Sequence, residues 1–206
     1  MTYTRLHTTS ETLRQFILDD FLSDVGATGL ATFFSGANRS VSLQTPEEME
    51  GNQQGLSLWL YRVVRDEHRL NDPPVVRPLP SGRVELVPPP LPLRLHYLAT
   101  PLATGSPDPE QRILGRVLQL FHTYPVVSGA ALGGALTGTE VQIHVRLESL
   151  SLDEITRVWE ALEGSYQLSV SYEVTLANIE SAAQPVRGSV VESVRNDAAL
   201  IVAREG

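Results

Sequence analysis

The segment LSLWLYRVV, residues 56–64, decides the fold, because it is typical of a β-strand with two apolar faces. Side chains alternate between the two faces of a strand, and here both alternating sets are apolar. One set is Leu56, Leu58, Leu60 and Val64, and the other is Trp59, Tyr61 and Val63. Such a strand is covered on both sides or lies in the middle of a sheet. We therefore expect this segment to be a central strand.

Three later segments, residues 93–98, 140–148 and 168–176, alternate apolar and polar residues and predict strands with one buried face. Shorter strands are expected at residues 30–34 and 41–43. The polar positions of the three alternating segments are Arg94, His96, Gln142, His144, Arg146, Ser169, Ser171, Glu173 and Thr175. At least one face of the sheet is therefore expected to be wet or to meet a partner.

Three segments carry helix signals. A capping box of Thr8 and Glu11 predicts the start of the first helix, and one of Ser151 and Glu154 predicts the start of the third. Asp108 is expected to be the N-cap of the second helix, directly before a proline. Together with the strands, these helices predict a single α+β domain, in which two or three helices cover one face of a mixed sheet.

The remaining segments are expected to connect these elements. Residues 73–92 hold eight prolines, which predicts an extended surface connection without a regular ladder, with a partner-binding motif as the alternative. Residues 46–55 and 128–138 are interpreted as a polar loop and a flexible glycine-rich loop. The domain is expected to span residues 1–180, with the proline-rich connector inside it. Residues 181–206 are expected to form an extended C-terminal arm that is held down by a neighbour.

Composition excludes several kinds of chemistry. The 206 residues include no cysteine, and all 16 basic residues are arginine, so thiolate nucleophiles, iron–sulfur clusters and lysine-dependent sites are excluded. The net charge of −8, with scattered arginines, argues against nucleic-acid binding. No apolar run is long enough to span a membrane, and the polar N-terminus does not resemble a secretion signal.

An enzymatic interpretation would have to use histidines and carboxylates. His96, His144 and Glu173 would converge if their strands paired, and could then form the metal site of a small hydrolase. The other interpretation is an ordinary polar sheet face. No H-E-x-x-H or G-x-S-x-G motif is present. We therefore predict no catalytic residue, no cofactor and no metal, and keep the hydrolase as the alternative function.

Several segments in a fixed order resemble a known family. They are residues 58–63 (LWLYRV), 88–101 (PPPLPLRLHYLATP), 113–119 (ILGRVLQ), 125–127 (PVV), the helix at 152–162 and residues 166–174 (YQLSVSYEV). This set is similar to the cap proteins of extracellular contractile injection systems, phage-tail-like particles of the antifeeding-prophage and Photorhabdus virulence cassette type. The resemblance runs to about Ile179.

The resemblance implies a structural protein with a fold like that of phage tail terminators. Such caps form a six-membered ring that terminates the inner tube at the end away from the baseplate and ties the sheath to it. The implied partners are copies of the same chain, the tube and the sheath. The implied location is a particle that assembles in the cytoplasm and is released or kept inside the cell. Another ring or adaptor of the same particle, at the sheath end or near the baseplate, is the alternative.

Three groups of residues are candidates for assembly surfaces. The polar strand positions Arg94, His96, Gln142, His144 and Arg146 are candidates for a lumen or intersubunit surface. The proline-rich connector and the arm are candidates for contacts with ring, tube or sheath neighbours. In these two segments the candidates are Pro88, Pro89, Pro90, Val190, Val191, Leu200, Ile201 and Val202.

Overall fold

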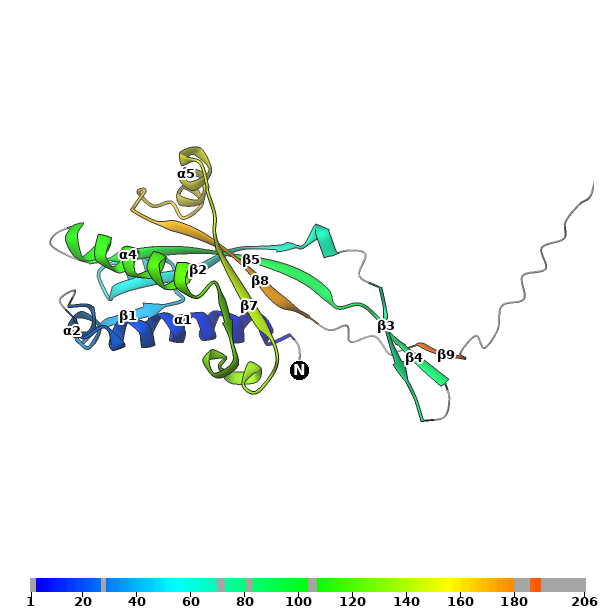
Figure 1. Cartoon of the computed structure of the whole chain (residues 1–206). Helices are drawn as coiled ribbons and strands as arrows, with labels where there is room; N and C mark the ends of the chain where they lie inside the picture. Colours follow the sequence, from blue (N-terminus) through cyan, green and yellow to red (C-terminus); the bar gives the residue numbers. More distant parts are fainter. Residues whose placement is uncertain are drawn as a thin grey trace, which may run out of the picture. The chain divides into compact units, whose positions relative to one another are not determined.

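The chain divides into two compact units. The computed structural model describes residues 3–26, 29–69, 73–80, 83–103, 107–179 and 186–189 (Figure 1). The first unit, here called the sheet unit, comprises Met1–Leu70 and Leu91–Ile179. The second, here called the hairpin unit, comprises Asn71–Pro90 and Glu180–Gly206. Each unit is described by itself below.

A six-stranded mixed sheet forms the frame of the sheet unit. Its strands, in spatial order, are β1 (Arg39–Ser42), β2 (Gln54–Arg65), β5 (Leu91–Leu102), β8 (Val170–Ile179), β7 (Gln142–Leu147) and β6 (Val126–Ser128). The β1–β2 pair is parallel and the other pairs are antiparallel. The expected mixed α+β fold is therefore confirmed, and β2 lies inside the sheet, as its two apolar faces predict.

A bulge in β2 sets which residues share a face of this sheet. Trp59 pairs with Leu98 on β5, and the register then shifts between Leu60 and Arg62 so that Arg62 pairs with His96. One extra residue, Tyr61, is accommodated at the shift.

The main core lies on one face of the sheet, here called the inner face. The helices α1 (Arg5–Ser23), α2 (Leu30–Phe34) and α4 (Pro107–Thr123) contribute to it, and Figure 1 shows α1 and α4 running alongside the strands. Their buried side chains pack against strand residues such as Leu56, Leu95 and Tyr97. The two long helices therefore cover one face, as the sequence predicts.

The helix α5 (Leu152–Ala161) packs on the opposite face, here called the outer face. Trp159 of α5 is buried in a second, smaller cluster with Leu98 of β5, and Trp59 of β2 packs against it. The Trp159 Nε1 donates a hydrogen bond to the Ser169 Oγ at 3.1 Å. The predicted capping box of Ser151 is confirmed at the start of this helix.

The start of α1 differs from the prediction. The helix begins at Arg5, and Thr8 lies inside it, where its hydroxyl donates to the carbonyl of Thr4 at 3.0 Å. Thr8 and Glu11 therefore form no capping box. The Ser10 hydroxyl points into the core and shares a hydrogen bond of 2.8 Å with Tyr97 Oη, which explains polar residues on the buried side of this helix.

Two other predictions for the N-terminal segments are wrong. Residues 30–34 form the helix α2, because Gly29 adopts a left-handed conformation before it and Phe34 stacks on Phe21, with ring centroids 4.5 Å apart. Residues 46–49 form the short helix α3 (Pro46–Met49) within the expected polar loop. A capping box of Thr45 and Glu48 starts α3.

The second helix and the glycine-rich loop also differ from expectation. The helix α4 begins at Pro107, so Asp108 lies in its first turn and is not its N-cap. The glycine-rich segment forms the 3₁₀ turns η2 (Gly129–Ala131) and η3 (Gly134–Leu136) after β6. The backbone N–H of Gly133 donates to Thr12 Oγ1 of α1 at 3.1 Å, which attaches this segment to the core.

The hairpin unit contains a three-stranded antiparallel sheet. Its order is β3 (Val75–Pro78), β4 (Arg83–Val87) and β9 (Val186–Ser189). The prediction that residues 73–92 form no regular ladder is therefore wrong. The ladder tolerates its prolines because β3 is an edge strand and Pro78 is its last residue.

Within the part of the chain that the structure describes, no helix is both long and apolar enough to cross a membrane.

Candidate functional site

A charged cluster occupies the outer face of the sheet next to α5. Within one cross-strand row, Glu173 of β8 pairs with His96 of β5 on one side and with Arg146 of β7 on the other. In the next row, Thr175 pairs with both Arg94 and His144. Cross-strand partners point to the same face, so the polar positions expected from the alternation do lie together.

Glu173 holds two arginines at once. Its Oε2 accepts a hydrogen bond from Arg94 at 3.2 Å, and its Oε1 accepts one from Arg146 at 2.8 Å. Asp66, which follows β2, lies 3.8 Å from the Arg94 Nε, close enough for attraction but too far for a hydrogen bond. Glu173 is buried, so these guanidinium groups compensate a charge that would be costly alone.

A second set of contacts connects the buried imidazole of His96 to Tyr61. Glu148 Oε1 lies 3.0 Å from His96 Nδ1, and Glu148 Oε2 accepts a hydrogen bond from Ser171 at 2.5 Å. A carboxylate only accepts, so His96 Nδ1 carries a hydrogen and donates it. The Tyr61 hydroxyl lies 2.9 Å from Ser171 Oγ and, since Ser171 gives its hydrogen to Glu148, donates to it. Burial raises the pKa of Tyr61, which favours its donating form.

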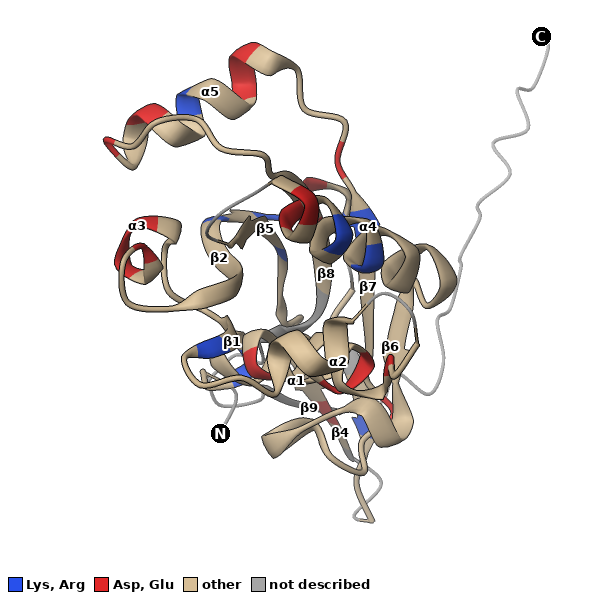
Figure 2. Ribbon diagram, turned by 90° about the vertical axis from the view of Figure 1, so that its left-hand side faces the viewer, with Lys and Arg blue, Asp and Glu red and all other residues tan. Residues whose placement is uncertain are grey.

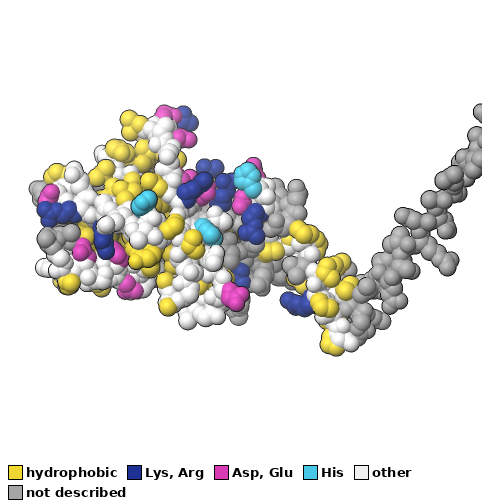
Figure 3. All heavy atoms as spheres, in the orientation of Figure 1, with side chains coloured by type: hydrophobic (Ala, Val, Ile, Leu, Met, Phe, Trp, Pro, Cys, Tyr) yellow, Lys and Arg dark blue, Asp and Glu magenta, His cyan; other side chains and the backbone are white. Residues whose placement is uncertain are grey.

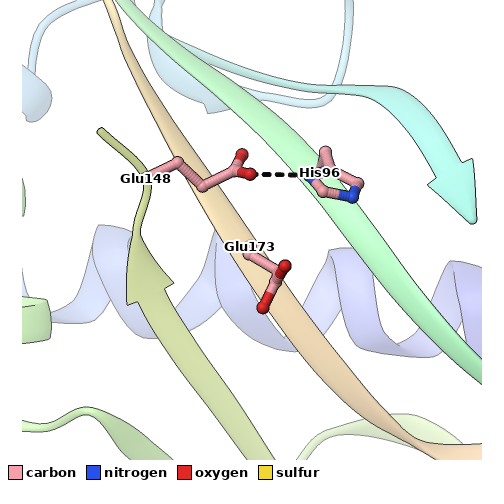
Figure 4. Close-up of side chains that lie close together, drawn as sticks. All are labelled: His96, Glu148 and Glu173. Carbon is pink, nitrogen blue, oxygen red and sulfur yellow. Dashed lines mark hydrogen bonds and ion pairs between the residues drawn. The ribbon is translucent and has the colours of Figure 1, made fainter. Parts of the chain in front are cut away.

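His96, Glu148 and Glu173 have the side chains that bind divalent metals, and their ligand atoms lie within 4.8 Å of one another (Figure 4). The carboxylate oxygens already have partners, however, although His96 Nε2 is buried without a hydrogen-bond partner among the described residues. Both oxygens of Glu173 accept from guanidinium groups, and both oxygens of Glu148 accept from His96 and Ser171. The two arginines also add positive charge where a cation would have to enter. The residues present therefore fit a hydrogen-bonded network better than a metal centre.

The predicted convergence of His96, His144 and Glu173 is correct for two residues only. His144 is exposed and pairs with Thr175, one cross-strand row away from Glu173. Glu148 takes the third place in the cluster. The alternation along residues 140–148 could have identified it, because Glu148 has the same parity as Arg146 and so continues the polar side of that strand.

The other candidate assembly residues are placed as follows. Gln142 is exposed and pairs with Ser128 of β6, at the edge of the sheet. Pro88, Pro89 and Pro90 follow β4 in the hairpin unit, and Pro89 is exposed. Val190, Val191, Leu200, Ile201 and Val202 lie outside the described residues.

The mixed α+β fold of this chain is similar to that of two solved tube-terminating proteins. One similar structure is the sheath/tube terminator of PVC, an extracellular contractile injection system, solved in the extended state. Its sequence is 15% identical, and the match has a TM-score of 0.60 and covers 97% of this chain and 65% of that one. The anti-feeding prophage cap, a tube terminating cap, is 16% identical, with a TM-score of 0.59 over 93% of this chain and 59% of that one.

The family follows from the sequence itself. The model of the Pvc16 N-terminal domain matches residues 8–193, so the chain belongs to that family, and the resemblance seen in the sequence is confirmed. The chain spans less than two thirds of the length of either solved terminator. No curated protein matches it.

Proposed function

We propose that this chain is a structural end cap, which forms a homo-hexameric ring and terminates the inner tube and sheath of a phage-tail-like contractile injection particle. The observation that carries the proposal is the terminator fold over 97% of the chain. Membership of the Pvc16 N-terminal domain family supports it independently. In this proposal the ring assembles in the cytoplasm, binds neither nucleic acid nor membrane, and joins a particle that is released or stays in the cell.

The charged cluster supports a structural role. Its carboxylates are used to hold arginines, a serine and an imidazole, and its contacts cross from β5 over β8 to β7 and the residue after it. Such a network fixes the relative positions of strands, as the rigid face of a ring subunit requires. The hydrolase alternative needs His144 beside Glu173, which the register does not provide.

The hairpin unit supplies the proposed contact with the tube or the sheath. Along its strands, Val76 pairs with Leu86 and Pro78 pairs with Val84, so these four apolar residues share one face. Val76 is 56% exposed and Leu86 is 37% exposed. In our proposal a tube or sheath subunit covers this face, and Pro88–Pro90 and the arm residues Val190, Val191, Leu200, Ile201 and Val202 extend the contact.

A deletion experiment tests the proposed function. The gene would be removed from a strain that makes the particle, and tube lengths would be measured by negative-stain electron microscopy. We expect tubes of uncontrolled length, and tubes of uniform length once the full chain is restored. A gold-labelled tag on the chain should mark the particle end opposite the baseplate. Uniform tubes in the deletion strain, or label at the baseplate, would refute the end-cap role.

A further inference from the structure

One end of the sheet unit is strongly acidic. Glu47, Glu48 and Glu50 are exposed on and after α3, and the Glu47 carboxylate lies against Gly164, directly after the exposed Glu163. Glu50 also lines a pocket of about 470 Å³ together with Glu110 of α4. Figure 2 shows these acidic segments at α3 and α5. We call Glu47, Glu48, Glu50, Glu110 and Glu163 the acidic patch.

One arginine beside this patch already has partners of its own. Arg39 lines the same pocket, but its guanidinium stacks on the ring of Phe33, 4.3 Å from the centroid. Its Nη1 also donates to the Phe33 carbonyl at 3.3 Å. These contacts do not remove the positive charge of Arg39, but two carboxylates, Glu50 and Glu110, line the pocket against this one guanidinium, so the pocket has a net negative charge.

A complementary surface lies on the outer face of the same sheet. Arg62, Arg146 and His144 are exposed there, while the carboxylates of Glu173 and Asp66 lie beneath them, each only 10% exposed. Arg146 is held in place by Glu173 although its side chain is 73% exposed. Figure 3 shows arginine and histidine side chains gathered in this region. We call Arg62, Arg94, Arg146 and His144 the arginine face.

The arginine face is ready to bind carboxylates. Each guanidinium has five N–H donors. Glu173 accepts from only one nitrogen of Arg146, so other N–H groups of Arg146 can donate to a carboxylate of a partner. Arg62 makes no ion pair within the part of the chain that the structure describes. Because buried carboxylates already fix Arg94 and Arg146, little side-chain entropy remains to be lost on binding.

The two surfaces cannot meet within one molecule. β2 runs from Gln54, which lines the acidic pocket, to the arginine face, and Arg62 lies eight residues along it. At about 3.3 Å per residue this separates the two surfaces by about 26 Å of rigid strand. The two surfaces therefore do not pair within one copy, whereas a second copy of the chain carries a complement to each of them.

We propose that the acidic patch of one copy docks on the arginine face of the next, and that this contact, repeated around the assembly, forms the ring. The inference rests on the proposed homo-oligomeric cap. A contact between two different patches is heterologous, and it closes into a ring when the repeated rotation permits. Copies with a net charge of −8 repel each other elsewhere, so complementary patches also fix the register of docking.

Charge reversal tests this contact on the purified full chain. Arg62→Glu with His144→Glu alters the arginine face and keeps the Arg146–Glu173 ion pair. Glu47→Arg with Glu50→Arg alters the acidic patch and keeps Glu48, which caps α3. We expect each double variant alone to stay monomeric by native mass spectrometry, and an equal mixture of the two to form alternating rings. Circular dichroism checks that both are folded.

A matched control and a second measurement complete the test. Arg112→Glu with Arg157→Glu makes a comparable change at exposed arginines outside both surfaces, and should assemble like the wild-type chain. In assembled particles, Glu47→Cys with Arg62→Cys should give covalent oligomers with a bifunctional maleimide reagent, because the chain has no other cysteine. Rings formed by either charge-reversal variant alone, or capped tubes without crosslinks, would overturn the contact while leaving the end-cap role intact.

Discussion

His96 of β5 and Glu148, which follows β7, are joined by a hydrogen bond of 3.0 Å although β8 lies between their strands. The bond therefore crosses a whole strand on the outer face. Beside it, Glu173 of β8 binds Arg94 and Arg146, so the three strands are connected by side chains as well as by their ladder. This cluster connects strands that carry the arginine face, which makes it testable through both stability and assembly.

The Glu173→Gln variant should be less stable than the wild-type chain. The substitution keeps the shape of the side chain but removes the carboxylate that binds Arg94 and Arg146, so the half-buried Arg94 keeps only the more distant Asp66 as a counter-charge. We expect the free energy of unfolding to fall by about 2–3 kcal/mol, measured by urea denaturation with an unchanged m-value. Glu160→Gln, an exposed position on α5, is the control and should change it by less than about 0.5 kcal/mol. Equal effects of the two variants would contradict a supporting role for Glu173.

The cluster should not respond to metal removal. If His96, Glu148 and Glu173 form a hydrogen-bonded network, the unfolding temperature should stay the same after dialysis against a chelator and after addition of zinc. Both conditions can be checked by differential scanning calorimetry. A fall in unfolding temperature with chelator, reversed by zinc and absent in Glu148→Gln, would instead identify a metal site.

Alternation along the strands was enough to predict which polar residues share a face of the sheet. A period of two places Arg94 and His96 on one face of β5, but the strand register decides that Glu173 lies opposite His96 and that His144 lies opposite Thr175. The same alternation extends to Glu148, which continues the polar side of residues 140–148 although it lies one residue beyond the end of β7. Its position depends on a backbone hydrogen bond from its N–H to Ser171, a tertiary contact that local sequence does not encode.

Other errors arise where tertiary packing outweighs local preference. Residues 30–34 contain aromatic and β-branched residues, yet they form α2, because Leu30 and Phe34 are one helical turn apart and both are buried. Prolines at residues 73–92 suggested no ladder, but an edge strand tolerates proline when its missing donor would face away from the sheet. In both cases the outcome depends on packing or on the position of a strand in its sheet, which local residue preferences do not report.

Stability should fall at alkaline pH because of Tyr97. Burial raises the pKa of Tyr97 to about 12, while its bond to Ser10 acts in the opposite direction. An unfolded tyrosine ionises near pH 10, so between about pH 10 and 12 the unfolded chain loses a proton that the folded chain keeps. This stabilising contribution is complete below pH 10 and decreases as the pH rises through this interval. Tyr61 and Tyr172 have raised pKa values as well, so they add to the loss.

The variant Tyr97→Phe isolates this contribution. We expect the loss of unfolding free energy between about pH 10 and 12 to be about 2–3 kcal/mol smaller than in the wild-type chain. Urea denaturation at the two pH values gives the difference, and absorbance near the tyrosinate band reports the ionisation directly. An identical alkaline loss in both proteins would show that Tyr97 ionises normally.

Two glycines should respond to alanine in opposite directions. Gly55, at the start of β2, has φ of +131°, and a Cβ there would lie 2.0 Å from the backbone oxygen of Ser40 on β1. Gly55→Ala must therefore break the parallel β1–β2 pairing, and we expect it to lower the unfolding temperature strongly or prevent folding. Gly115 lies on α4, where an added Cβ meets no atom within 4 Å.

Because alanine favours a helix over glycine, Gly115→Ala should raise the free energy of unfolding by about 0.5–1 kcal/mol. Thermal melts followed by circular dichroism compare the two variants under the same conditions. Both changes add the same methyl group, so the difference between the two variants reports the backbone conformation and the space around each glycine. A destabilised Gly115→Ala, or an unaffected Gly55→Ala, would mean that the parallel edge of the sheet or the exposed face of α4 differs from the structure described above.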